Sequence, residues 1–74
     1  MKIKYDQQAD AMYIRLNDGV FAVNKEVDND VILDIGKNNV LLGIEILNVS
    51  EKIPPEAMSH IDIQLGMPPK LAVA

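Results

Sequence analysis

The sequence predicts a mainly β, α+β domain: an antiparallel meander of about five strands followed by one or two short C-terminal helices. Three observations lead to this prediction. Polar and apolar residues alternate with period two along most of residues 2–47, as in strands with one buried face. Turn-forming Asp, Asn and Gly residues interrupt the alternation, and the period changes after Leu47, where two prolines follow. We place the β-meander domain at residues 1–53 and a C-terminal extension at residues 54–74.

The first two strands are predicted at residues 2–5 and 11–17. In the second, Met12, Ile14 and Leu16 fall on one face, and Tyr13, Arg15 and Asn17 fall on the other. Asp18-Gly19 favours a two-residue type I′ hairpin turn, because both of its central residues need positive φ. The pairs expected from this hairpin are Leu16 with Phe21, Ile14 with Val23 and Met12 with Lys25. We expect Lys25 near a sheet edge, with its ammonium group in water.

Two further turns are predicted at Asp28-Asn29-Asp30 and at Gly36-Lys37-Asn38-Asn39, where Asn and Gly tolerate left-handed backbone. Between these two turns, the core face continues through Val31, Leu33 and Ile35. The expected pairs are Val31–Val27, Leu33–Lys25 and Ile35–Val23 on one side, and Ile35–Val40, Leu33–Leu42 and Val31–Ile44 on the other. This register places Glu45 opposite Asp30, pointing outward, while Ile44 and Ile46 point inward.

Two short helical segments are expected after Leu47. Asn48 or Ser50 can cap a helical turn through Lys52, which Ile53-Pro54-Pro55 ends, because a residue before proline disfavours helix. Pro55 can begin a second helix that reaches His60. Its apolar stripe would consist of Ala57, Met58 and Ile61. The tail after Leu65 has no periodic pattern, and we expect it to fray or to pack on a partner.

Composition narrows the possible functions. A chain of 74 residues makes one small domain with a limited core, and without cysteine it has no disulfide to reinforce it, so self-association is the remaining means. A net charge of −4 argues against nucleic-acid binding by this chain alone. No apolar run reaches the ~20 residues of a membrane span. The N-terminus does not read as a signal peptide, so the expected compartment is the cytoplasm, without a membrane partner.

Candidate sites are weak, and we predict no catalytic residue, no metal site and no cofactor. Asp28-Asn29-Asp30 begins like a calcium loop, but Ile32 and Asn39 occupy later ligand positions. Asp6 and Asp10 bracket the first loop, where they can accept hydrogen bonds from backbone amides. The weak ligand candidates are Asp6, Asp10 and Glu45. A pairing of Asp34 with Glu45 for acid–base chemistry lacks a cleft in so small a sheet, and His60 has no evident catalytic partner.

The reverse face of the predicted sheet is too apolar to be fully solvated. Among the charged residues of this face project five others: Tyr13, Ala22, Ile32, Leu41 and Leu47. Because the C-terminal helices can cover only one face, a homodimer or a small protein partner would cover the other. The predicted partner interface is Tyr13, Ile32, Leu41 and Leu47. The alternative is that the tail wraps around this face.

Two separated motifs resemble a known family. The first motif is matched by Tyr5, Asp6, Ala9, Asp10, Ala11, Tyr13 and Ile14. The second is matched by Gly43 to Asn48 with Ser50, with Val49 in place of the usual alanine. On these residues the chain resembles the small prokaryotic family called domain of unknown function 2283 over roughly residues 1–53. The resemblance implies a compact, mainly antiparallel β domain without established activity. Some members resemble partners of small toxin-like proteins, which implies a possible antitoxin role.

The function expected from these observations is a non-catalytic protein-interaction module, a homodimer or an antitoxin-like partner of a small toxin. The alternative of a different class is a small-ligand-binding or hydrolytic enzyme that uses the carboxylates of Asp6, Asp10 and Glu45.

Overall fold

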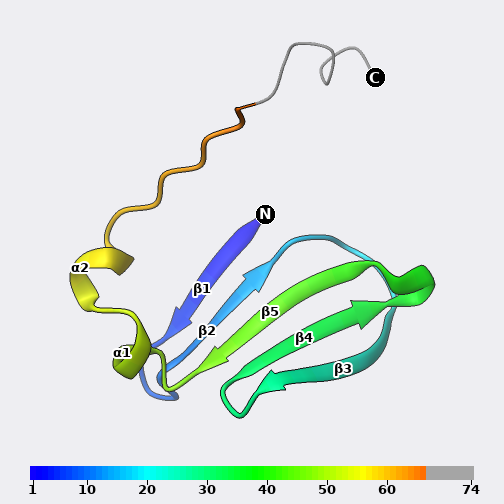
Figure 1. The fold of residues 1–74 in the computed structure, drawn as a ribbon, viewed down its shortest axis with the longest axis horizontal. Coiled ribbons are helices and arrows are strands. Elements are labelled where there is room, and N and C mark those ends of the chain that lie inside the picture. Colours follow the sequence, from blue (N-terminus) through cyan, green and yellow to red (C-terminus); the bar gives the residue numbers. More distant parts are fainter. Residues whose placement is uncertain (67–74) are drawn as a thin grey trace.

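The structure is a computed structural model that describes residues 1–66. It is a five-stranded antiparallel sheet followed by two short helices, which confirms the predicted fold class (Figure 1). The strands are β1 (Lys2–Asp6), β2 (Ala11–Arg15), β3 (Phe21–Asp28), β4 (Val31–Gly36) and β5 (Leu41–Leu47). A 3-10 turn, η1 (Lys37–Asn39), joins β4 to β5, and the helices are α1 (Val49–Lys52) and α2 (Pro55–Met58).

The strand order is β1-β2-β5-β4-β3, so β2 pairs with β5 and not with β3. The predicted Asp18-Gly19 hairpin and its three side-chain pairs are therefore wrong. Residues 16–20 instead cross the ends of β5 and β4 (Figure 1). Backbone hydrogen bonds hold this crossing: the Leu16 amide donates to the Leu42 carbonyl at 2.8 Å, and the Lys37 amide donates to the Val20 carbonyl at 3.1 Å. The β5 partner gives Ile14 and Met12 two isoleucines as neighbours, which the hairpin could not provide.

The β3–β4 hairpin forms largely as predicted, with Leu33 opposite Lys25 and Ile35 opposite Val23. A register shift after Glu26 places Asp28, and not Val27, opposite Val31. Lys25 lies on an edge strand, as expected.

The predicted β4–β5 register is wrong by two residues. Leu33 lies opposite Ile44, and Glu45 lies opposite Ile32 instead of Asp30. The connection through η1 is longer than a tight turn, with Asn38 and Asn39 in the left-handed region at φ 61° and 62°. Because the error is an even number of residues, the side chains of Val31 to Asp34 and of Gly43 to Ile46 keep their predicted faces, whereas the register shift after Asp34 places Leu41 opposite Ile35.

The pairing defines two faces of the sheet. We call the first the apolar face; its central cross-strand row is Ile3, Ile14, Ile44, Leu33 and Lys25, and the next row is Tyr5, Met12, Ile46, Val31 and Asp28. We call the second the charged face; its rows are Lys4, Tyr13, Glu45, Ile32 and Glu26, and then Lys2, Arg15, Gly43, Asp34 and Asn24.

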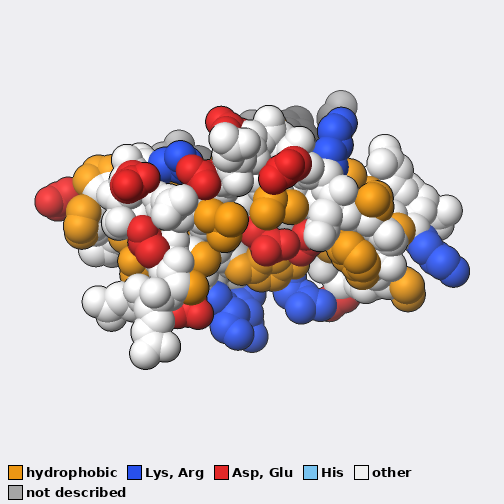
Figure 2. Space-filling model, turned by 90° about the horizontal axis from the view of Figure 1, so that it is seen from below, with side chains coloured by type: hydrophobic (Ala, Val, Ile, Leu, Met, Phe, Trp, Pro, Cys, Tyr) orange, Lys and Arg blue, Asp and Glu red, His pale blue; other side chains and the backbone are white. Residues whose placement is uncertain are grey.

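The core is small. Among residues 1–66, Leu42 and Val49 are the only apolar side chains that are buried. Leu42 packs against Gly19 and Gly36, where a β-carbon on either glycine would lie within about 3.1 Å of its methyl groups. Val49 is fully covered at the start of α1. Much of the remaining apolar surface is open, and Figure 2 shows hydrophobic side chains at the surface among acidic and basic ones.

The short helices follow the predicted positions closely. Asn48 occupies the N-cap position of α1 with left-handed backbone, although its side chain does not cap the helix. The second helix begins at Pro55 as predicted but ends at Met58 instead of His60. The predicted stripe of α2 contacts one corner of the apolar face, where Ala57, Met58 and Ile61 line a hollow with Ile3, Tyr5 and Met12. The predicted behaviour of the tail falls mainly on residues 67–74, which lie outside the described residues.

Candidate functional site

The loop between β1 and β2 is held by its own aspartate. The Asp6 carboxylate accepts hydrogen bonds from the backbone amides of Gln8 at 3.0 Å and Ala9 at 3.2 Å. This is the amide-bonding role that the sequence favoured for Asp6, and it is the ordinary use of an aspartate at the start of a turn.

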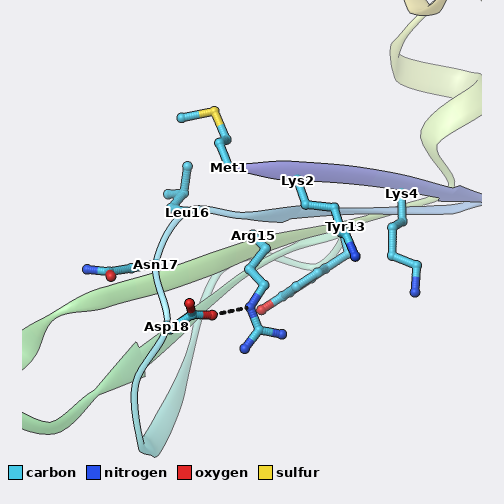
Figure 3. Close-up of a pocket in the computed structure, with 8 residues that line it drawn as sticks. All are labelled: Met1, Lys2, Lys4, Tyr13, Arg15, Leu16, Asn17 and Asp18. Atoms are coloured by element: carbon cyan, nitrogen blue, oxygen red, sulfur yellow. Dashed lines mark hydrogen bonds and ion pairs between the residues drawn. The ribbon is translucent and has the colours of Figure 1, made fainter.

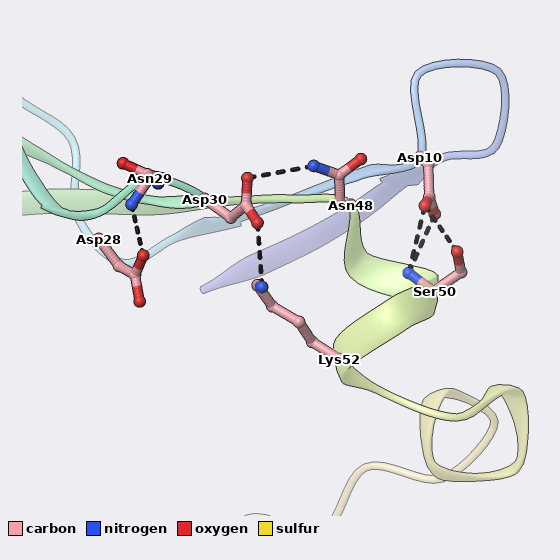
Figure 4. Close-up of polar contacts among 7 residues, drawn as sticks. All are labelled: Asp10, Asp28, Asn29, Asp30, Asn48, Ser50 and Lys52. Carbon is pink, nitrogen blue, oxygen red and sulfur yellow. Dashed lines mark hydrogen bonds and ion pairs between the residues drawn. The ribbon is translucent and has the colours of Figure 1, made fainter.

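Asp10 connects the same loop to helix α1 (Figure 4). Its carboxylate accepts hydrogen bonds from the Ser50 hydroxyl at 2.6 Å, the Ser50 amide at 3.1 Å and the Tyr5 hydroxyl at 3.0 Å. The Asp10 carbonyl also accepts a bond from the Val49 amide at 3.0 Å. The hydrogen bond from Ser50 is the main reason that the pKa of Asp10 is lowered. Asp10 therefore caps the first turn of α1 from a distant part of the chain.

Asp30 holds the other side of α1. Its carboxylate contacts Lys52 Nζ at 3.0 Å and accepts a hydrogen bond from Asn48 Nδ2 at 3.1 Å (Figure 4). The contact with Lys52, followed by the bond from Asn48, lowers the pKa of Asp30, and Asp30 in turn raises the pKa of Lys52. The turn at Asp28-Asn29-Asp30 thus supports helix α1. Within residues 1–66, no group of three or more acidic or histidine side chains is arranged to hold a metal ion.

The charged face brings together a tyrosine and two acids, Tyr13, Asp34 and Glu45, which we call the Tyr13–Asp34–Glu45 cluster. Tyr13 lies directly opposite Glu45, and Gly43 lies opposite Asp34. The Tyr13 ring lies across Gly43, where a β-carbon would be 2.6 Å from Tyr13 Cζ. Gly43 is therefore required for Tyr13 to reach across β5 toward Asp34 on β4.

The surroundings of Glu45 in this cluster favour its protonated form. A side-chain hydrogen bond with Asp34, burial and the Asp34 charge raise the pKa of Glu45. Burial is the main reason that the pKa of Tyr13 is also raised, followed by hydrogen bonding to Asp34. Asp34 Oδ1 is buried and has no hydrogen-bond partner among residues 1–66. A proton held between Asp34 and Glu45 would lower the repulsion between two adjacent carboxylates.

A row of cations lies beside this cluster on β1 and β2. Lys2 is opposite Arg15, and Lys4 is opposite Tyr13. Together these side chains line an open hollow of about 550 Å³ (Figure 3). Arg15 Nε contacts the Asp18 carboxylate at 3.2 Å, although both side chains remain largely exposed. The sequence shows cations scattered along the chain, whereas the sheet brings three of them to one face.

The predicted interface residues are also placed by the sheet. Tyr13 and Ile32 lie in one row of the charged face, and Leu47 lies on the same face opposite Ala11. All three are only partly exposed. Leu41 is 37% exposed beside the register shift at the start of β5.

Sequence reasoning brought Asp34 and Glu45 to the same face but set the pair aside, and it missed the role of Ser50 as a partner of Asp10. The signal was present in the two motifs. Tyr5 and Asp10 of the first motif meet Ser50 of the second, and Tyr13 of the first lies over Gly43 of the second. The motif residues thus include the residues that anchor α1 and some of those on the charged face.

Comparisons with known proteins give a family and no activity. No curated protein matches the chain, and no solved structure matches it. No helix within residues 1–66 is long and apolar enough to span a membrane. A family described as "Protein of unknown function (DUF2283)" matches residues 2–50 of the 74. The match includes all five strands and both motifs, and the chain belongs to this family.

Proposed function

We propose that the protein is a non-catalytic interaction module that forms a homodimer, in which the apolar face of one copy packs against the apolar face of a second. One observation carries the proposal: among residues 1–66, only two apolar side chains are buried, although the chain folds into a sheet with one predominantly apolar side. A sheet of this kind needs a second layer, and α2 supplies one only over the corner formed by β1 and β2.

The size of the open face sets the expected affinity. Five strands about 4.8 Å apart, each contributing about five residues of about 3.3 Å, give a face of roughly 400 Å² in projection. Two such faces lie at or below the lower end of specific interfaces. A dissociation constant in the micromolar range is therefore expected.

The chemistry of the face favours a second copy as the occupant. The row from Ile3 through Ile14 and Ile44 to Leu33 carries no charge, and Lys25 follows it only at the β3 edge. Two copies related by a two-fold axis can bury these rows against each other while each Lys25 keeps its ammonium group in water. Asp28, opposite Val31, lies at the same β3 edge, so both charges of this face can stay in water and need not be desolvated, which would otherwise weaken so small an interface.

A pair of neighbouring substitutions on β3 tests this proposal. Val23 is 52% exposed and lies opposite Ile35 on the apolar face, so Val23→Glu should remove the dimer without unfolding the chain. Asn24→Glu adds the same charge to the opposite face and should leave the dimer intact. Sedimentation equilibrium between about 1 and 200 µM should give an average mass that rises with concentration from near the 8.2 kDa chain mass toward twice that mass for the wild type. A monomer over this whole range, or equal loss of association in both variants, would overturn the proposal.

The sequence predicts Tyr13, Ile32, Leu41 and Leu47 as the interface with either a second copy or a different protein. Because we propose that the second copy takes the apolar face instead, this surface is the site to examine if the partner is a different protein. The family resemblance suggests a small toxin-like protein there, as in an antitoxin complex. Co-expression with the product of the neighbouring gene, followed by co-purification, tests that prediction. A wild-type chain that remains monomeric alone and forms only a mixed complex would support the antitoxin role and refute the homodimer.

A second candidate function is ligand binding or hydrolysis at the Tyr13–Asp34–Glu45 cluster. The observation that favours it is the raised pKa of Glu45 beside a buried oxygen of Asp34, because a carboxyl group with a raised pKa is suited to donate a proton as a general acid. Asp6 and Asp10 do not share this site, since their carboxylates bind the first loop and α1. Glu45→Gln should abolish any hydrolytic activity detected in the wild type, and full retention of that activity would remove this candidate.

A further inference from the structure

The cations on β1 and β2 are placed where they repel one another. Lys2 lies directly opposite Arg15, and Lys4 is two residues away on the same face. Like charges at directly opposed positions of an antiparallel pair destabilise the sheet. The chain contains 11 acidic residues and 7 basic ones, so unpaired cations are not explained by a shortage of acids.

The surrounding acids neutralise only Arg15 in this row. Within residues 1–66, Lys2 and Lys4 form no ion pair, and Arg15 contacts only Asp18, through Nε. Lysines on an edge strand discourage unwanted strand pairing, which accounts for Lys2 and Lys4. That reason does not extend to Arg15, because β2 is an interior strand of the sheet.

We propose that Lys2, Lys4 and Arg15 form a binding site for a small anion that carries a phosphoryl group. The hollow that they line has a volume of about 550 Å³, within the usual range for small-molecule sites. Figure 3 shows the ends of Lys2, Arg15 and Tyr13 reaching the same side of the sheet. Three cations, one of them also in contact with Asp18, suit a phosphoryl group with two negative charges better than a single carboxylate.

The charges next to the site favour a small ligand over a nucleic acid. Glu45 follows Tyr13 in its row, and Asp34 lies one strand beyond Gly43. A chain of phosphates that extended across the charged face would meet these acids, and the net charge of −4 adds to the repulsion. The site lies on the face opposite the proposed dimer interface, so the two proposals fail independently.

Titration with pyrophosphate, followed by backbone amide chemical shifts, tests the site. The expected result is saturable shifts centred on residues 2–4 and 13–15 in the wild-type chain, at constant ionic strength. Lys4→Gln should weaken binding by about two- to fivefold, the effect of one exposed ion pair. Asp18→Asn should strengthen binding by a similar factor, because it removes the acid that contacts Arg15.

Lys25→Gln is the matched control, since it removes one cation from the apolar face. It should leave the affinity unchanged. Equal weakening by Lys25→Gln and Lys4→Gln, or shifts that spread over the surface without saturating, would overturn the site. Tighter binding of a single-stranded oligonucleotide than of pyrophosphate, at equal phosphate concentration, would also overturn it in favour of a polymer ligand.

Discussion

The substitution Gly43→Ala tests how closely β2 and β5 approach on the charged face. An added β-carbon would lie 2.6 Å from Tyr13 Cζ and 2.9 Å from the Ile14 carbonyl oxygen, and closer still to Tyr13 Oη. The tyrosine ring can rotate away at some cost. The Ile14 carbonyl cannot, because it belongs to the backbone of β2, and the sheet itself would have to shift.

The expected loss follows from these two contacts. Insertion of a methyl group into a site without room costs about 1–3 kcal/mol, and the backbone contact places this substitution near 2 kcal/mol. In a domain of this size each kcal/mol lowers the melting temperature by about 4–8 °C, so we expect a fall of roughly 8–16 °C. The expected loss of about 2 kcal/mol is a large part of the ~3–5 kcal/mol of net stability available to so small a core.

Thermal and urea unfolding, followed by circular dichroism, measure the effect. All variants must be compared at one chain concentration, because association raises apparent stability. Gly66→Ala is the matched control, since nothing lies within 4 Å of a β-carbon there. Tyr13→Ala in the Gly43→Ala background should recover part of the loss. A Gly43→Ala chain within about 0.5 kcal/mol of the wild type would refute the close approach, because ordinary surface substitutions change stability by that amount.

Three further predictions concern the core and the acids. Leu42→Ala should cost about 2–5 kcal/mol in urea unfolding because Leu42 is buried, whereas Leu41→Ala should cost much less; similar losses would contradict the described core. Asp10→Asn should flatten the acid limb of the stability profile: a lowered pKa stabilises the fold above about pH 4, and this contribution disappears as pH falls further. An unchanged acid limb would argue against the bond to Ser50. Glu45→Gln should have the opposite signature, because a raised pKa makes stability fall as pH rises above about 4.3, and the amide removes that fall. A slope that persists in Glu45→Gln would show that Glu45 is not its source.

Part of the candidate site could be predicted from the sequence. Alternation places Asp34, Glu45 and Tyr13 on one face in any register that keeps the apolar positions of the strands together, because the period of a strand is two. Their proximity could not be predicted in the same way. It depends on β2 lying beside β5. It also depends on a β4–β5 register that differs by two residues from the register that a tight turn would give. Both are decided by contacts between distant segments.

The Asp18-Gly19 error has the same origin. A two-residue hairpin is favoured locally, and its hydrophobic faces match. The alternative partner, β5, lies more than 25 residues farther along the chain, and it offers Ile44 and Ile46 to β2. Local rules do not weigh that gain against the hairpin, because they contain no term for packing between segments that are distant in sequence.

The sequence by itself determined the strands, the face of most strand side chains and the positions of the two short helices, because these depend on alternation, turn residues and prolines within a few positions of one another. Tertiary structure alone decided which strands are neighbours, and therefore that Asp10 caps α1, that Tyr13 crosses Gly43, and that Lys2 lies opposite Arg15. The physical reason is that strand pairing joins residues far apart in the chain, and its free energy comes from the side chains that meet across the pair.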